Sequence, residues 1–208
     1  MTSSMIKVIA LAAMIMDHIG AIYFPQYAVF RIIGRIALPL FAWQLTISLD
    51  KTHDAKKLLT RVFIFALLSQ IPYSMIFGSR LNIFFSFTLS IATLMLYRKK
   101  KAAGYAALFL SIVLSQGLNI EYGWYAVLMV FLFYLYKENI YRMIISQALL
   151  NLAYLPPSNE IQVFSLLSLL LIYLYNNERG GIYKYKLALY CIYPVHLLVL
   201  VGLHRLIG

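Results

Sequence analysis

The chain has 208 residues, of which 62% are hydrophobic and 12% are charged, and its mean hydropathy is +0.80. This balance lies outside the range of soluble domains and predicts an integral membrane protein. A formal net charge of +11 would favour nucleic-acid binding in a soluble protein, but here the basic residues lie in joints between apolar segments, and no nucleic-acid partner is expected.

Apolar segments of roughly membrane-spanning length follow one another along the whole chain. About 20 apolar residues cross a bilayer as a helix. Nine helical segments are expected, at residues 5–24, 27–48, 59–77, 82–97, 102–118, 122–136, 140–156, 161–176 and 187–206. The fourth and sixth are short, and a re-entrant segment or a steep tilt would change the count by about one. The sequence therefore predicts an all-α, polytopic membrane bundle of about nine transmembrane helices, forming one domain over residues 1–208.

Lysine and arginine gather in alternate joints between these segments. The basic joints are the second, fourth, sixth and eighth, and their residues are Lys51, Lys56, Lys57, Arg61, Arg98, Lys99, Lys100, Lys101, Lys137, Arg142, Arg179, Lys184 and Lys186. By the positive-inside rule these joints face the cytoplasm. The protein is expected in the lipid bilayer of the cytoplasmic membrane, with its N-terminus on the cytoplasmic side and its C-terminus on the outer side.

The first apolar segment contains an acid and an imidazole, in the stretch "MIMDHIG". Ionisable groups are costly in hydrocarbon, so Asp17 and His18 are candidates for function. Arg31 and Arg35 lie at the matching depth of the second segment, which forms an antiparallel hairpin with the first. We expect an ion pair between Asp17 and one of these arginines, either as a structural clamp or as part of a site. Asp17 and His18 are about 100° apart on a helix, so Asp17 is not expected to orient the imidazole.

A lysine precedes His18 by eleven positions, close to three helical turns. Lys7 and His18 would lie about 20° from a common face and about 16 Å apart along the axis. A cation at the cytoplasmic mouth and a base deeper in the membrane suit a ligand with an anionic head and a long thin arm, such as coenzyme A. Lys56, Lys57 and Arg61 fall in the same leaflet and would join Lys7 in binding its phosphates. A lysine at a cytoplasmic helix end is also a common topology anchor.

Three more polar residues are candidates for binding an acceptor substrate. Asn82 and Glu121 open the fourth and sixth segments at the outer face, where such residues also cap helices. His196 follows Pro194, which is expected to kink the last segment or to free a carbonyl, and a kink would aim the imidazole into a cavity. No metal site is expected, because no ligand spacing supports one and the chain has a single cysteine.

Six stretches resemble the TraX family of polytopic membrane proteins, which is associated with acetylation of the F-pilin N-terminus. They are "MIMDHIGAIYFP", "FRIIGRIALPLFAWQL", "RVFIFALLSQIPYS", "LNIFFSFTLSI", "IQVFSLLSLLLIYLYNNERGGIYKY" and "YCIYPVHLLVL". TraX proteins are in turn similar to the acyltransferase-3 superfamily, whose pattern is a basic residue, ten further positions and a catalytic histidine. Lys7 and His18 match that pattern.

The resemblance implies an acyl-CoA-dependent acyltransferase. It would take acetyl-CoA or another acyl-CoA from the cytoplasm and modify a hydroxyl or amine acceptor on the outer side. Nothing in the sequence identifies the acceptor as a pilin, so a peptide N-terminus, a glycan and a small molecule stay open.

For such an enzyme we expect general base catalysis by a neutral His18. Its imidazole would take the proton from the acceptor as the acceptor attacks the thioester carbon. The arginine not paired with Asp17, either Arg31 or Arg35, would stabilise the oxyanion or bind an anionic acceptor. A covalent acyl-histidine stays open as an alternative.

Two other classes of protein fit the same residues. A secondary transporter would also carry an acid, an imidazole and arginines inside the membrane, and often an internal repeat, of which the sequence has a faint echo. A non-catalytic assembly protein would use these residues as structural pairs.

Overall fold

The computed structural model describes residues 1–154, 160–181 and 186–207, and within them the chain is helical apart from its joints. The helices are α1 (Ser3–Tyr23), α2 (Ala28–Gly34), α3 (Ala37–Lys51), α4 (Ala55–Phe77), α5 (Ile83–Lys99), α6 (Lys101–Gly117), α7 (Gly123–Tyr136), α8 (Ile140–Tyr154), the 3-10 helix η1 (Glu160–Leu167), α9 (Ser168–Tyr173) and α10 (Lys186–Ile207). The all-α prediction is confirmed for these residues. Each predicted segment corresponds to one helix or to two consecutive helices.

Four stretches of the described chain are long and apolar enough to cross a membrane, judged by length and composition. They are Ser3–Tyr23, Ala28–Lys51, Ala55–Phe77 and Leu187–Leu206. Gly123–Tyr136 and Glu160–Tyr173 are shorter apolar helices.

The second predicted segment differs from expectation because it is interrupted. A single helix was expected over residues 27–48, but α2 ends at Gly34 and α3 begins at Ala37. Pro39 lies in the first turn of α3, where it has no N–H to donate to the Arg35 carbonyl four residues earlier, and its ring would clash with that carbonyl in a continuous helix. The eighth segment also differs, since it begins as the 3-10 helix η1 and only then continues as α9.

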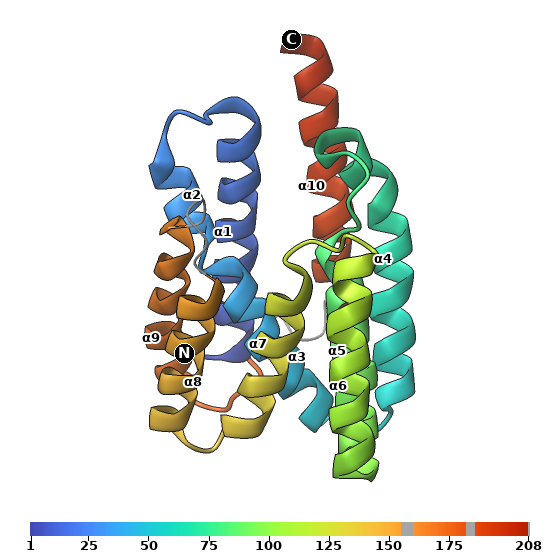
Figure 1. The fold of residues 1–208 in the computed structure, drawn as a ribbon. Coiled ribbons are helices and arrows are strands. Elements are labelled where there is room, and N and C mark those ends of the chain that lie inside the picture. Colours follow the sequence, from blue (N-terminus) through green and yellow to red (C-terminus); the bar gives the residue numbers. More distant parts are fainter. Residues whose placement is uncertain (155–159, 182–185, 208) are drawn as a thin grey trace.

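Successive segments run antiparallel through the bundle, and α3 and α7 lie at its centre (Figure 1). α3 packs against α1, α7 and α9, while α7 packs against α5, α6 and α8. Leu40 and Leu49 of α3 and Val127 and Phe133 of α7 are fully buried. The central position of α3 places the break at residues 35 and 36 inside the molecule.

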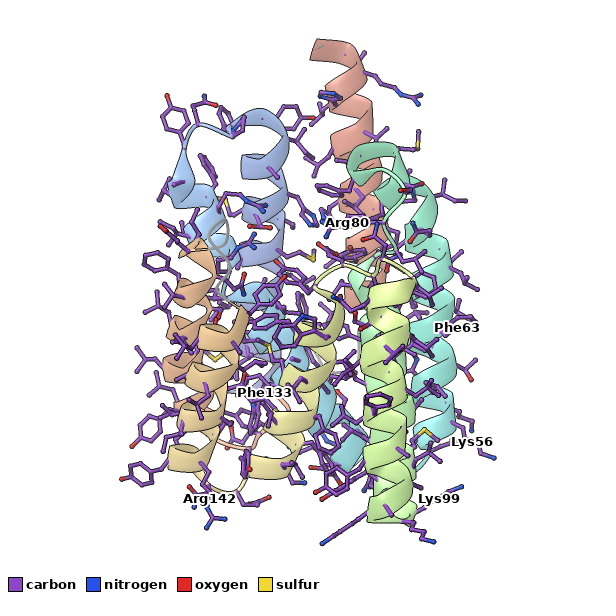
Figure 2. The ribbon with its side chains drawn as sticks, in the orientation of Figure 1. Lys56, Phe63, Arg80, Lys99, Phe133 and Arg142 are labelled. Atoms are coloured by element: carbon purple, nitrogen blue, oxygen red, sulfur yellow. The ribbon has the colours of Figure 1, made fainter. Side chains whose placement is uncertain are left out.

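The basic joints meet at one end of the bundle, which we call the basic end. Figure 2 shows Lys56, Lys99 and Arg142 there, whereas Arg80 lies toward the opposite end. Lys184, in the last basic joint, lies outside the described residues. Polar contacts join the segments at this end. Arg98 Nη1 donates to the Leu49 carbonyl (2.9 Å), and Lys137 pairs with Asp50. The segment after α9 is held by two more hydrogen bonds, from Lys51 Nζ to the Asn177 carbonyl (2.7 Å) and from the Ser3 N–H to the Glu178 carbonyl (2.8 Å).

The joints before α5 and α7 meet toward the opposite end, where α10 also ends (Figure 1). The Leu81 N–H donates to the Asn119 carbonyl (3.2 Å), and the Glu121 N–H donates to the Leu81 carbonyl (2.8 Å). These two bonds form an isolated parallel bridge between Leu81 and Ile120. The bridge holds the joint that carries Glu121 and Tyr122 against the rest of the bundle.

Candidate functional site

A buried carboxylate is held between two arginines where α1 meets α2. Asp17 Oδ2 lies 2.8 Å from Arg31 Nη1, and Asp17 Oδ1 lies 2.6 Å from Arg35 Nη2. Asp17 and Arg35 are each only 9% exposed. The predicted ion pair is confirmed, but the expectation that one arginine stays unpaired is wrong, because each carboxylate oxygen takes one guanidinium. Together the three side chains carry one net positive charge.

Two glycines allow α1 and α2 to approach closely at this point. A Cβ atom on Gly34 would overlap the Asp17 side chain, and one on Gly20 would overlap Phe30. Gly34 is the last residue of α2 and immediately precedes Arg35. The missing side chain therefore leaves the space that the Asp17 carboxylate fills.

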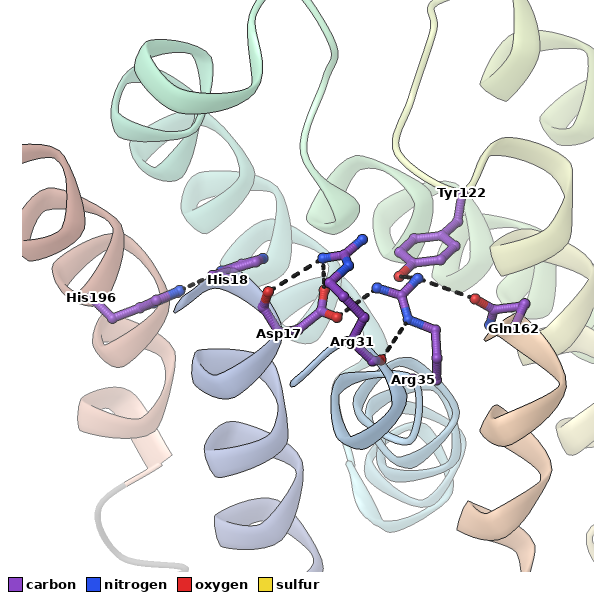
Figure 3. A network of polar contacts seen from close by, with 7 residues as sticks. All are labelled: Asp17, His18, Arg31, Arg35, Tyr122, Gln162 and His196. Carbon is purple, nitrogen blue, oxygen red and sulfur yellow. Dashed lines mark hydrogen bonds and ion pairs between the residues drawn. The ribbon is translucent and has the colours of Figure 1, made fainter. Parts of the chain in front are cut away.

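His18 and His196 form a hydrogen-bonded pair between α1 and α10. His18 Nδ1 lies 2.7 Å from His196 Nε2, and the ring planes differ by 7°. On its other side His196 Nδ1 lies 2.9 Å from the Ile192 carbonyl oxygen. The sequence suggested that His196 enters a cavity but did not predict this contact. Asp17 makes no part of it, as the helical geometry predicted (Figure 3).

These contacts fix the tautomer of both imidazoles when they are neutral. A carbonyl oxygen only accepts, so His196 Nδ1 carries the hydrogen and His196 Nε2 is left as an acceptor. His18 Nδ1 must then donate to it. His18 Nε2 is consequently the nitrogen with a free lone pair, and in Figure 3 it points away from His196. The pair therefore presents His18 Nε2 as a base.

Arg35 also begins a buried polar network that leads away from Asp17. Its Nη1 donates to the Tyr122 hydroxyl (3.0 Å) and to Gln162 Oε1 (3.2 Å), as Figure 3 shows. Gln162 Nε2 donates to the Tyr125 hydroxyl (3.1 Å), which in turn donates to Asn151 Oδ1 (3.1 Å). The network ties α2 to η1, α7 and α8. Arg35 is thus held in place from several helices.

Tyr122 and Glu121 reach the site from the joint that the Leu81–Ile120 bridge holds. Tyr122 has a φ of 58°, in the left-handed region, a conformation that costs a non-glycine residue about 1–2 kcal/mol. The bridge and the hydrogen bond from Arg35 keep this conformation in place. The neighbouring Glu121 carboxyl interacts with the Tyr73 hydroxyl and the Ile83 N–H.

Two cavities lie along the inner face of α1. The first, which we call the His18 cavity, has a volume of about 40 Å³ and is lined by Asp17, His18, Glu121 and Tyr122 among others. The second, the Lys7 cavity, has a volume of about 110 Å³ and extends to Lys7. They share the walls formed by Met14, Phe41, Ile83, Phe87 and Tyr193. The two cavities therefore adjoin and together extend from Lys7 to His18.

Two buried polar atoms on the cavity walls have no hydrogen-bond partner among the residues that the structure describes. They are Gln44 Nε2, in the Lys7 cavity, and the Tyr193 hydroxyl, in the wall that both cavities share. Gln44 Oε1 accepts a hydrogen bond from the Ser3 hydroxyl (2.6 Å), near the start of α1. Buried polar groups are normally satisfied, so these two atoms are candidates for contact with a ligand.

The remaining predicted site residues lie elsewhere. A third cavity, beside α10, is lined by Lys56, Lys57 and Arg61. Lys57 Nζ lies 3.6 Å from Asp54 Oδ2. That cavity shares no lining residue with the Lys7 cavity, and Phe65 of its wall stacks on Tyr190 of the other.

Asn82 lines none of the three cavities described here. Its Oδ1 accepts from the Phe84 N–H at the start of α5 (3.0 Å), and its Nδ2 donates to the Ala66 carbonyl (2.8 Å). Both ends of its amide thus join α4 to α5, which is the capping role that was weighed against acceptor binding.

Four site residues are absent from the sequence-based prediction: Gln44, Tyr122, Gln162 and Tyr193. The two glutamines lie in apolar runs, which is the signal that identified Asp17 and His18, and it could have identified them too. The two tyrosines had no such signal, because the chain contains 17 tyrosines.

Comparison with known proteins gives one family and two relatives. Residues 2–204 match the family described as TraX protein. An uncharacterized protein of Rickettsia prowazekii, RP591, is 36% identical over 73 residues, which are 35% of this chain and 27% of that protein, so the chain spans about a quarter of this relative. A probable fimbrial assembly protein of Dichelobacter nodosus, FimC of serogroup H1, is 24% identical over 231 aligned positions, covering 94% of this chain and 92% of that protein. No solved structure matches significantly.

Proposed function

The chain belongs to the TraX family, and from this premise we propose that it is a membrane acyltransferase. It transfers an acyl group, with acetyl as the first candidate, from acyl-CoA to a hydroxyl or amine acceptor. The protein lies in the cytoplasmic membrane, with the basic end of the bundle facing the cytoplasm and the C-terminus on the outer side. The acceptor is a peptide N-terminus, a glycan or a small molecule that approaches from the outer side.

The observation that carries the proposal is the pair of adjoining cavities between a cation and a base. Lys7 lines one cavity and His18 lines the other, and the two share five wall residues. The five shared wall residues are apolar or aromatic, and Gln44 and Ser48 add polar groups in the Lys7 cavity, which suits a thin arm that carries amide groups. The phosphates of coenzyme A carry several charges and cannot enter hydrocarbon, so they stay at the basic end, near Lys7 and the cluster of Lys56, Lys57 and Arg61. Only the thioester reaches His18.

In this mechanism His18 Nε2 acts as the general base. It accepts the proton from the acceptor hydroxyl or amine while the acceptor attacks the thioester carbon. The resulting imidazolium keeps its Nδ1–H directed at His196 Nε2, so the charged ring is held by the same contact that set its tautomer. It then returns the proton to the departing CoA thiolate.

Of the two roles that the sequence left open for the Asp17–Arg31–Arg35 cluster, we propose the structural clamp. Both guanidinium groups are bound to Asp17, and neither arginine lines the cavity in which the carbonyl would react. We assign the cluster to fixing the α1–α2 hairpin beside His18. Its net positive charge also favours an anionic acceptor in the His18 cavity.

A second candidate function follows from the name of one relative. The Dichelobacter protein is called a probable fimbrial assembly protein, which supports a role in building a surface fibre without any acyl chemistry. Acylation of a fibre subunit before its assembly would fit the same name. Thioester chemistry separates an acyltransferase from a non-catalytic assembly protein and from a transporter, and substrate flux into sealed vesicles separates the latter two.

The test is release of CoA thiol from acetyl-CoA by the purified protein, with and without extracts of cell-surface material as the acceptor. We expect release by the wild type, and a loss of about 100-fold or more in His18→Ala. His204→Ala is the matched control, since His204 is an exposed histidine near the far end of α10. Equal rates in His18→Ala and the wild type would exclude His18 as the base. No release by the wild type, together with substrate flux into sealed vesicles, would favour the transporter.

A further inference from the structure

Tyr193 lies at the junction of the two cavities. It is the third residue before His196 on α10, and it lines both the Lys7 cavity and the His18 cavity. Its ring is 6.2 Å from the His18 ring and 5.4 Å from the His196 ring, measured between centroids. A thioester that passes from one cavity to the other therefore passes this side chain.

The Tyr193 ring is well held, but its hydroxyl is not. The ring packs edge-on against Phe84, with centroids 4.8 Å apart, and the residue is 3% exposed. The hydroxyl has no hydrogen-bond partner among the described residues. Tyr193 lines the His18 cavity together with His18, Glu121 and Tyr122. A buried hydroxyl without a partner destabilises a fold unless something else uses it.

The other strong donors of this region are less well placed. Arg31 and Arg35 are bound to Asp17, and neither lines the His18 cavity or the Lys7 cavity. Tyr122 lines the His18 cavity but not the Lys7 cavity from which the acyl donor comes. Tyr193 is the tyrosine that meets both requirements, a place at the junction and an unused hydroxyl.

We infer that the Tyr193 hydroxyl donates the hydrogen bond that stabilises the oxyanion of the thioester during acyl transfer. The inference rests on the proposed function. The acceptor oxygen or nitrogen forms a bond to the thioester carbon, and its proton passes to His18 Nε2. The electron pair of the C=O double bond moves onto the oxygen, which Tyr193 binds. When the double bond re-forms, the C–S bond breaks and the CoA thiolate takes the proton from His18.

A hydrogen bond to a carbonyl lowers its stretching frequency, which gives a test that needs no acceptor. The probe is acetyl-CoA with a ¹³C-labelled thioester carbonyl, bound to the purified protein and followed by isotope-edited infrared spectroscopy. We expect the labelled band at a lower frequency in the wild type than in Tyr193→Phe. Tyr141→Phe is the matched control, because Tyr141 is 77% exposed on α8, and its band should match the wild type.

Kinetics and stability together separate this role from a structural one. Tyr193→Phe should lower kcat for thioester cleavage by about 10²–10³-fold with little change in KM, because the bond strengthens as charge develops. Its melting temperature should be equal to or above that of the wild type, because the substitution removes only a buried hydroxyl without a partner and keeps the ring.

The inference is overturned if the band has the same frequency in the wild type and Tyr193→Phe, or if Tyr122→Phe abolishes the shift and Tyr193→Phe does not. Acetyl-CoA that gives no bound band in the wild type would overturn the proposed function as well. The two failures are therefore distinguishable, since the first leaves His18-dependent cleavage intact.

Discussion

At the scale of single residues, the position of one hydrogen atom decides what His18 can do. The Ile192 carbonyl requires the hydrogen on His196 Nδ1, and His196 then requires one on His18 Nδ1. This chain of contacts leaves His18 Nε2 free to accept a proton. His196 is accordingly a positioning residue, since it acts through His18.

We predict that His196→Ala lowers kcat for thioester cleavage by about 10²-fold and leaves the KM for acyl-CoA nearly unchanged. Without His196 the neutral His18 is free to adopt the tautomer with its hydrogen on Nε2. In that tautomer Nε2 has no lone pair with which to accept a proton. His204→Ala again serves as the control. Steady-state kinetics check the prediction, and an unchanged kcat in a folded His196→Ala protein would contradict it.

A second residue-scale prediction concerns the carboxylate between the arginines. Asp17→Asn removes the charge that pairs with Arg31 and Arg35, which leaves the buried Arg35 and the partly exposed Arg31 without their anionic partner. Loss of one partner of a buried pair costs about 3–5 kcal/mol, so thermal unfolding in detergent should begin at a clearly lower temperature. Asp54→Asn, at the exposed start of α4, should change the melting temperature far less. Equal melting temperatures for Asp17→Asn and the wild type would mean that the clamp is not formed.

At the scale of helices, the site depends on a break in one element and on close packing in another. Hydropathy alone predicted the helices, because the length of each apolar run can be counted in the sequence. The break after Gly34 could have been predicted from Pro39, whose effect on the Arg35 carbonyl is local. The joint that carries Glu121 and Tyr122 could not, because its left-handed backbone depends on a bridge to Leu81 from a distant part of the chain.

We predict that Gly34→Ala disturbs both stability and activity. The added methyl group would overlap the Asp17 carboxyl group, and overpacking of this kind costs about 1–3 kcal/mol. Gly117→Ala is the matched control, since a Cβ atom there meets no heavy atom within 4 Å. Melting temperature and CoA release test the pair of variants. If Gly34→Ala behaves like Gly117→Ala, the α1–α2 hairpin is looser than described.

At the scale of the whole molecule, the basic joints share one end of the bundle. The candidate site around His18 lies farther from that end than Lys7 does. The positions of Lys and Arg in alternate joints predicted the first feature, because antiparallel helices return every second joint to the same side. The eleven-residue spacing of Lys7 and His18 predicted a common face of α1, and the structure places both residues on the walls of adjoining cavities. The sequence predicted His196 as a site residue, but it could not predict the contact of His196 with His18 or the place of Tyr193, since α10 meets α1 only through tertiary packing.

The central claim is that one passage connects acyl-CoA at the basic end with the base at His18. Its most direct test is a comparison of kcat and KM for acyl-CoA in Lys7→Ala and His18→Ala. A phosphate contact far from the carbonyl binds the ground state and the transition state alike, so Lys7→Ala should raise KM more than it lowers kcat. His18→Ala should lower kcat and leave acyl-CoA binding intact. Equal KM values for Lys7→Ala and the wild type, or full kcat in His18→Ala, would contradict the account.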